Sequence, residues 1–194
     1  MKKGVMYTAI ITLLVLIGFL VKALLAKNYE FIGYWVVLVI LFLLVIWLDK
    51  KFNFPLTGII LFSIWSISHM AGGLLYVSGT RLYDLVLIPI LGEPYFILKY
   101  DQLIHAYCYF AISILVYFAL KKYFIKQKSQ TALIIFSILA AVGIGLLNEV
   151  IEFGMVIFAD AADAVGGYYN TALDLVFNLI GAVLGTLFAK SVLD

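Results

Sequence analysis

Six long apolar runs, separated by charged residues, proline or glycine, most constrain how this chain folds. They cover about residues 5–25, 31–48, 55–76, 102–124, 131–158 and 169–190. Each run is long enough to cross the hydrocarbon core of a bilayer as an α-helix, which needs about 20 residues. Hydrophobic residues also make up 65% of the chain, well above the usual share in a soluble domain. The sequence therefore predicts an all-α membrane protein, a bundle of about six transmembrane helices.

The predicted spans account for nearly all of the 194 residues, which leaves no room for a separate soluble domain. We therefore predict a single transmembrane domain over residues 1–194. Residues 1–50 would form two peripheral helices and residues 55–190 a four-helix functional core. The apolar segment 77–100 is interrupted by Pro89, Gly92 and Pro94 and is too short to cross the bilayer. We expect it to form an interfacial or re-entrant element, either a lid or a lipid-facing entrance.

The distribution of basic residues predicts the orientation of the chain in the plasma or inner membrane. The connections on one side hold Lys2, Lys3, Lys50, Lys51, Lys121, Lys122, Lys126, Lys128 and Lys190. Those on the other side hold Lys22, Lys27, Arg81 and Lys99. Because the side richer in Lys and Arg is usually cytoplasmic, we expect both termini in the cytoplasm.

Ionisable and amide side chains collect near the extracytoplasmic ends of the last four predicted spans. They are His69, Asp101, His105, Asn148, Glu149, Glu152, Asp174 and Asn178. A helical rise of about 1.5 Å per residue puts them in one layer, roughly 18–32 Å from the cytoplasmic ends of their helices. Several, such as Asp101 and His105, are four residues apart and so share a helix face. Since ionisable groups in spans almost always face the interior of a bundle, we expect one outward-facing cavity.

Acidic residues outnumber basic ones in this layer, where only Arg81 and Lys99 are basic. The acids are Asp84, Glu93, Asp101, Glu149, Glu152, Asp160, Asp163 and Asp174. Carboxylates at close quarters do not all stay ionised without a counter-charge, which leaves three alternatives: a divalent metal, shared protons or a cationic substrate. Mixed nitrogen and oxygen ligands suit Zn²⁺ or Mn²⁺, and an all-oxygen subset suits Ca²⁺ or Mg²⁺.

These residues have candidate roles in a catalytic or metal-binding site. The candidate catalytic residues are Glu149, Asp101, His105 and His69. The candidate metal ligands are Asp101, His105, Glu149, Glu152 and His69. The candidate substrate-binding or orienting residues are Asn148, Asp174, Asn178 and Tyr169.

Some of the same positions also have a purely structural interpretation. "TALD", residues 171–174, fits a helix-capping pattern, in which Asp174 would bond free backbone donors. Glycines at 72, 73, 181 and 185 predict close helix packing. The single cysteine, Cys108, falls in an apolar run and is read as a packing residue. An interfacial aromatic belt is expected from Tyr83, Tyr95, Tyr100, Tyr168 and Tyr169.

The polar positions resemble two membrane-protein families over about residues 60–190. The first is the VanZ-like family, whose pattern resembles three motifs of this chain: Asp101-Gln102-x-x-His105, Glu149-x-x-Glu152, and Asp174-x-x-x-Asn178 followed by Gly181. In the VanZ-like pattern, Lys stands at the position of Gln102 and Gln at the position of Glu152. The second is the YjdF-like inner-membrane family, which the chain resembles more closely through the segments "HMAGGLLY", "NEVIE" and "YNTALDLVFN". The resemblance implies a role in the cell envelope, since VanZ-like relatives are linked to glycopeptide-antibiotic resistance. It implies no particular reaction.

The sequence leaves three kinds of function open. The first is an enzyme, with a divalent metal as candidate cofactor, acting on a lipid or cell-envelope component. The second is an ion-coupled transporter or permease, and the third is a non-catalytic assembly protein. Because the polar layer lies on one side, whereas carriers usually place polar groups near the midplane, the enzyme is favoured. Besides membrane lipids no partner is indicated: a net charge of +2 without a Gly-rich phosphate loop argues against nucleic acid and nucleotides, and the oligomeric state stays open.

Overall fold

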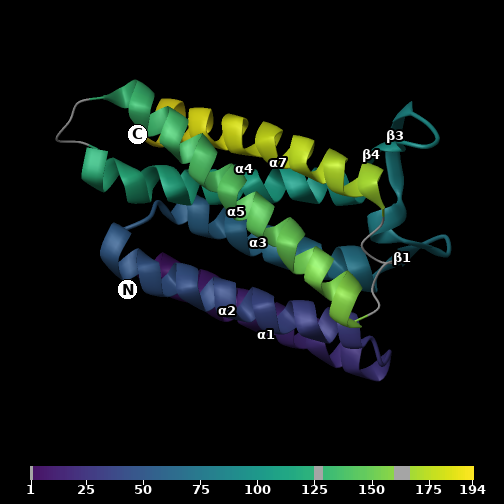
Figure 1. Cartoon of the computed structure of the whole chain (residues 1–194). Coiled ribbons are helices and arrows are strands. Elements are labelled where there is room, and N and C mark those ends of the chain that lie inside the picture. The colour runs from purple at the N-terminus through teal and green to yellow at the C-terminus, as the bar shows by residue number, and fades with distance from the viewer. Residues whose placement is uncertain (1, 125–128, 160–166) are drawn as a thin grey trace. The chain divides into compact units, whose positions relative to one another are not determined.

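The structure, a computed structural model, describes residues 2–124, 129–159 and 167–194 (Figure 1). Within these ranges, six helices are long and apolar enough to cross a membrane. They are α1 (Lys3–Leu25), α2 (Tyr29–Phe52), α3 (Leu56–Leu74), α4 (Tyr100–Phe124), α5 (Gln130–Ala159) and α7 (Tyr168–Phe188), which continues into the short π-helix η3 (Ala189–Leu193). The predicted helical membrane fold is confirmed, although α2 continues to Phe52 rather than ending at residue 48. Asp160, Asp163, Lys126 and Lys128 lie outside the described residues.

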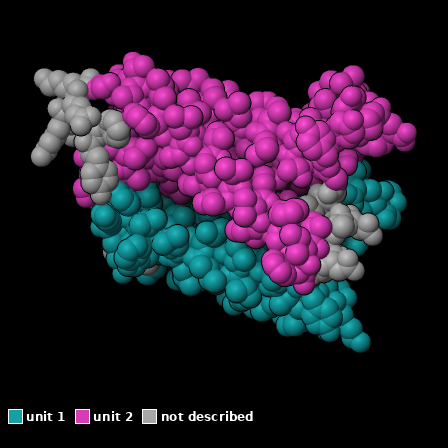
Figure 2. All heavy atoms as spheres, viewed as in Figure 1, with its two compact units in different colours: residues 1–85 teal, residues 86–194 magenta. Residues whose placement is uncertain are grey.

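The chain forms two compact units, unit 1 over residues 1–85 and unit 2 over residues 86–194 (Figure 2). In unit 1, helices α1, α2 and α3 each pack against the other two. In unit 2 the same holds for α4, α5 and α7. The boundary falls inside the predicted interfacial segment 77–100. The single domain over residues 1–194 and the four-helix core over 55–190 stay predictions.

Glycines allow helices to approach closely in both units, as the sequence predicts. In unit 1, a Cβ atom on Gly73 would lie 1.6 Å from the ring of Phe31, so α2 and α3 meet there only because that atom is missing. In unit 2, Cβ atoms on Gly181 and Gly185 would lie 2.0 and 2.2 Å from the backbone oxygens of Ala106 and Phe110. The glycine face of α7 therefore rests directly on the backbone of α4.

The segment between α3 and α4 forms two small antiparallel hairpins, which the sequence did not predict. In unit 1, β1 (Tyr76–Val77) pairs with β2 (Thr80–Arg81), and the 3₁₀-helix η1 (Leu82–Asp84) follows. In unit 2, β3 (Val86–Leu91) pairs with β4 (Ile97–Lys99), and β4 leads directly into α4. We call residues 86–99 the β3–β4 hairpin. It lies at the end of unit 2 where α4 and α7 begin (Figure 1).

The buried side chain of Gln102 attaches the β3–β4 hairpin to α4. Its Oε1 accepts hydrogen bonds from the backbone N–H groups of Leu98 at 2.7 Å and Lys99 at 3.1 Å. The side chain thus bonds two backbone donors at the junction of strand and helix. Gln102 therefore has a structural role at the start of α4.

Candidate functional site

The three helices of unit 2 bring a cluster of polar side chains together near the β3–β4 hairpin. We call it the acid–histidine cluster, and its members are Asp101 and His105 of α4, Asn148, Glu149 and Glu152 of α5, and Asn170, Asp174 and Asn178 of α7. Because α5 runs antiparallel to α4 and α7, residues 148–152 of α5 meet the first half of each of the other two helices. Residues distant in sequence thus meet at one end of the unit.

His105 is at the centre of the cluster and hydrogen bonds to Asn178. Its Nδ1 lies 3.0 Å from Oδ1 of Asn178. A carbonyl oxygen only accepts hydrogen bonds, so with the amide in this orientation Nδ1 carries the proton. The lone pair of Nε2 in the neutral ring then faces Oδ1 of Asp101 at 3.8 Å and Oδ1 of Asp174 at 4.0 Å. Three electron-pair donors converge there, an arrangement that a cation stabilises.

Asn170 holds the two aspartates in this orientation. Its Nδ2 donates to Oδ2 of Asp174 at 2.7 Å and to Oδ2 of Asp101 at 3.3 Å. The other oxygen of each carboxylate is thereby turned towards His105. Asp174 is fully buried, and its Oδ1 has no hydrogen-bond partner. Asn170 was not among the predicted site residues, although its place four residues before Asp174, on the same helix face, was an available signal.

Glu149 and Glu152 form the α5 side of the cluster. Oε1 of Glu149 lies 3.8 Å from Nδ1 of His105, and the residue is buried with no hydrogen bond to either carboxylate oxygen. Oε1 of Glu152 accepts a hydrogen bond from Asn148 at 2.8 Å. An amide therefore orients one glutamate, while the other is buried beside the imidazole without a donor.

Two overlapping sets of side chains are spaced closely enough to hold a metal ion. The first set is Asp101, His105 and Asp174, and the second is His105, Glu149 and Glu152. In each set, one potential ligand atom per residue lies within 4.8 Å of the other two. In the first set, Asn170 and Asn178 already orient the ligands. Such outer hydrogen bonds are typical of metal sites in proteins. Three protein ligands with a further position open are typical of catalytic zinc sites.

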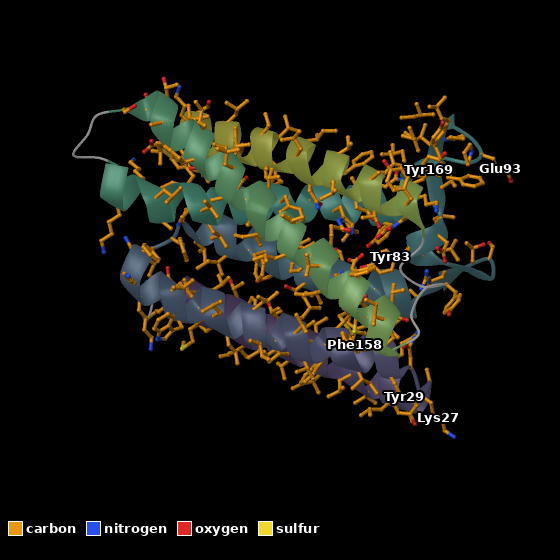
Figure 3. The ribbon with its side chains drawn as sticks, in the orientation of Figure 1. Lys27, Tyr29, Tyr83, Glu93, Phe158 and Tyr169 are labelled. Carbon is orange, nitrogen blue, oxygen red and sulfur yellow. The ribbon has the colours of Figure 1, made fainter. Side chains whose placement is uncertain are left out.

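Among the predicted site residues, His69 belongs to unit 1. Its Nδ1 lies 2.5 Å from the hydroxyl of Tyr83, a residue labelled in Figure 3. The rings of Trp65, Tyr34 and Phe31 lie 5.7, 5.4 and 6.2 Å from its own. An aromatic environment and a phenol therefore surround this histidine within unit 1. Its role as a metal ligand or catalytic residue stays a prediction.

Tyr169, a candidate substrate-binding residue, lies beside the β3–β4 hairpin (Figure 3). Its ring centroid is 5.1 Å from that of Tyr95 in the hairpin and 5.7 Å from that of Tyr168. These edge-to-face contacts fit the interfacial belt expected from the sequence.

The capping interpretation of Asp174 is wrong. α7 begins at Tyr168 with Gly167 at its N-cap, so Thr171 and Asp174 both lie inside the helix. The carboxylate of Asp174 accepts from the side chain of Asn170 rather than from free backbone donors. Asp174 is thus a member of the cluster. The outward-facing cavity expected from the sequence stays a prediction.

In the part of the chain that the structure describes, six helices long and apolar enough to cross a membrane define a multi-pass membrane protein, and three of them gather acids around one histidine. The chain belongs to the family described as "Predicted membrane protein (DUF2238)", whose family model matches residues 6–194. This is the YjdF-like family, so that resemblance is confirmed. No curated protein and no solved structure matches the chain. The likeness to VanZ-like proteins rests on the sequence motifs alone.

Proposed function

We propose that this protein is a membrane enzyme that binds a divalent metal ion through Asp101, His105 and Asp174 and acts on a lipid or cell-envelope component. The observation that carries the proposal is the convergence of Nε2 of His105 and one oxygen of each aspartate, with spacings of 3.8 and 4.0 Å to the imidazole. Asp174 Oδ1 is buried without a hydrogen-bond partner, which is costly unless a cation satisfies it.

The donor set fits Zn²⁺ or Mn²⁺ better than Ca²⁺, because one donor is an imidazole nitrogen. Bonds of about 2.0–2.1 Å in a tetrahedral site place neighbouring donor atoms about 3.3 Å apart. The spacings around His105 would have to shorten by roughly half an ångström, a change within reach of side-chain rotation. Asn170 and Asn178 would hold the ligands while this happens.

A bound metal would supply a Lewis acid that polarises a substrate oxygen or promotes ionisation of a water molecule. The remaining chemistry belongs to the side chains of the cluster. Glu149, buried next to His105 and without a hydrogen-bond donor, is the candidate proton acceptor. Asn178 keeps the proton of His105 on Nδ1, and Asn148 orients Glu152.

The location of the cluster supports a lipid or envelope substrate. The cluster lies at the end of unit 2 next to the β3–β4 hairpin, which the distribution of Lys and Arg assigns to the extracytoplasmic side. A substrate reaching it would come from the outer leaflet or from the space beyond it.

Elemental analysis of the purified protein tests the proposal. We expect about one zinc or manganese ion per chain in the wild type, and loss of this ion in His105→Ala and in Asp174→Asn. Glu149→Gln should keep the metal, since its carboxylate is not one of the three ligands. The matched control is Glu93→Gln, which removes an acid at the tip of the hairpin (Figure 3) and should also keep the metal. Wild-type protein without metal after dialysis against Zn²⁺ and Mn²⁺ would refute the metal site.

The same geometry favours one second candidate, a proton-coupled permease. The imidazole of His105 has carboxylates on both sides, with Asp101 and Asp174 near Nε2 and Glu149 near Nδ1. A ring in that position is suited to pass protons between them. Metal-free protein that dissipates a pH gradient in liposomes, and loses this property in His105→Gln, would support the permease over the enzyme.

A further inference from the structure

The β3–β4 hairpin is apolar on both of its faces. Successive side chains of a strand point to opposite sides, yet Leu87, Ile88, Ile90 and Leu91 of β3 are all exposed, Ile88 by 58% and Ile90 by 60%. An exposed strand in water usually alternates apolar with polar residues. A two-stranded hairpin with two apolar faces is also marginally stable in water unless something covers it.

The hairpin lies across the ends of α4 and α7. β4 continues into α4 without a connecting loop, and Gln102 attaches the two elements. β3 runs across the direction of α4 and α7 rather than along it (Figure 1). Since α4 and α7 cross the membrane, a ribbon crossing their ends extends sideways, at the level of the interface.

Aromatic contacts connect the hairpin to the start of α7. Tyr95 of the hairpin contacts Tyr169, and Tyr169 contacts Tyr168 in the first turn of α7. Tyrosine is enriched where a membrane protein passes from hydrocarbon to headgroups. The hairpin carries few charges, with Glu93 near its tip (Figure 3) and Lys99 at the end of β4. Its composition and its connection to α7 both match the bilayer interface.

We propose that the β3–β4 hairpin is a lipid-binding element, inserted in the bilayer interface with Ile88 and Ile90 among the upper acyl chains. The occupant of its apolar faces is lipid, rather than a second copy of the chain or another protein. The end of unit 2 that holds the acid–histidine cluster would then border on lipid. This inference does not depend on whether the cluster binds a metal.

Spin labelling in liposomes tests the proposal. Single cysteines replace Ile88, Ile90 or Glu93, and wild-type protein serves as the labelling background because its only cysteine, Cys108, is buried. After reconstitution into phosphatidylcholine–phosphatidylglycerol liposomes, power saturation measures the collision rates of each label with O₂ and with a water-soluble Ni²⁺ chelate. Ile90→Cys repeats the measurement made with Ile88→Cys, in case one variant folds poorly.

We expect the labels at residues 88 and 90 to meet O₂ several-fold more often than Ni²⁺, and the label at residue 93 to show the reverse. Labels at 88 and 90 with the same Ni²⁺ accessibility as the label at 93 would show that the hairpin lies in water. Labels at 88 and 90 that neither reagent reaches would show that protein covers them. Either result would overturn the proposal.

Discussion

Substituting alanine for Gly181 should separate α4 from α7 and open the acid–histidine cluster. A Cβ atom on Gly181 would lie 2.0 Å from the backbone oxygen of Ala106 and 2.8 Å from its carbonyl carbon. Ordinary van der Waals contact begins near 3.4 Å. Because the obstacle is backbone, no rotation of a side chain relieves the clash. One helix must move by more than an ångström.

The cost of this movement follows from the packing. Adding a methyl group to a well-packed core typically costs about 1–3 kcal/mol. Alanine itself favours a helix over glycine by roughly 0.5–1 kcal/mol, which offsets only part of that cost. The movement also carries Asp101 and His105 of α4 away from Asp174 of α7. The variant should therefore lose stability and metal together.

The buried thiol of Cys108, two residues after Ala106 on α4, provides the assay. A maleimide dye reacts with this cysteine only when α4 becomes exposed. If local opening limits the reaction, a net destabilisation of about 0.5–2 kcal/mol, after the gain in helix propensity is subtracted, raises the labelling rate about 2- to 30-fold. Gly143→Ala on α5 is the matched control, because nothing lies within 4 Å of its added Cβ. The control should label no faster than wild type.

If Cys108 in Gly181→Ala is labelled at the wild-type rate, the reasoning is refuted, because α4 and α7 would then not be in direct backbone contact. Equal acceleration in Gly143→Ala would refute it as well, because the effect would then come from alanine in any span. Gly185→Ala, whose Cβ would lie 2.2 Å from the backbone oxygen of Phe110, should behave like Gly181→Ala.

Three further substitutions separate the roles of individual side chains. Asn170→Ala leaves the three proposed ligands in place but frees the carboxylates it holds, so metal affinity should fall about 10- to 100-fold in a chelator competition titration. Gln102→Ala should speed hydrogen exchange at the backbone amides of residues 98 and 99 without changing metal content, because it removes their shared acceptor. Tyr83→Phe removes a hydrogen bond to His69, so the free energy of unfolding of unit 1, followed by tryptophan fluorescence, should fall by about 1 kcal/mol. Elemental analysis should show unchanged metal content.

The helices were predictable because each is a long run of apolar residues bounded by charge, proline or glycine. The end of α2 was harder to predict, because Asp49, Lys50 and Lys51 indicate the membrane boundary although the helix continues to Phe52. The β3–β4 hairpin was not predictable from periodicity. Residues 86–91 are apolar on both faces, so the alternation that usually marks a strand is missing.

Depth along each helix explains why polar residues on three separate helices could be grouped from the sequence. Helical rise and spacing place Asp101, His105 and Asp174 at one level and on defined faces. Which helix faces which depends on tertiary packing, and sequence spacing does not supply it. Spacing did place Asn170 on the face of Asp174, but only the packing of α4 against α7 brings it to Asp101 as well. The grouping of His69, a residue of unit 1, with the cluster stays a prediction.

X-ray absorption at the metal edge tests the central claim most directly, because it reports the ligands around a bound ion. The measurement compares zinc- or manganese-loaded wild type with His105→Gln. We expect one imidazole and otherwise oxygen ligands in the wild type; in the variant most of the metal should be lost, and any that remains should show no imidazole. A wild-type spectrum without imidazole, or one that His105→Gln leaves unchanged, would contradict the assignment of Asp101, His105 and Asp174 as the metal site.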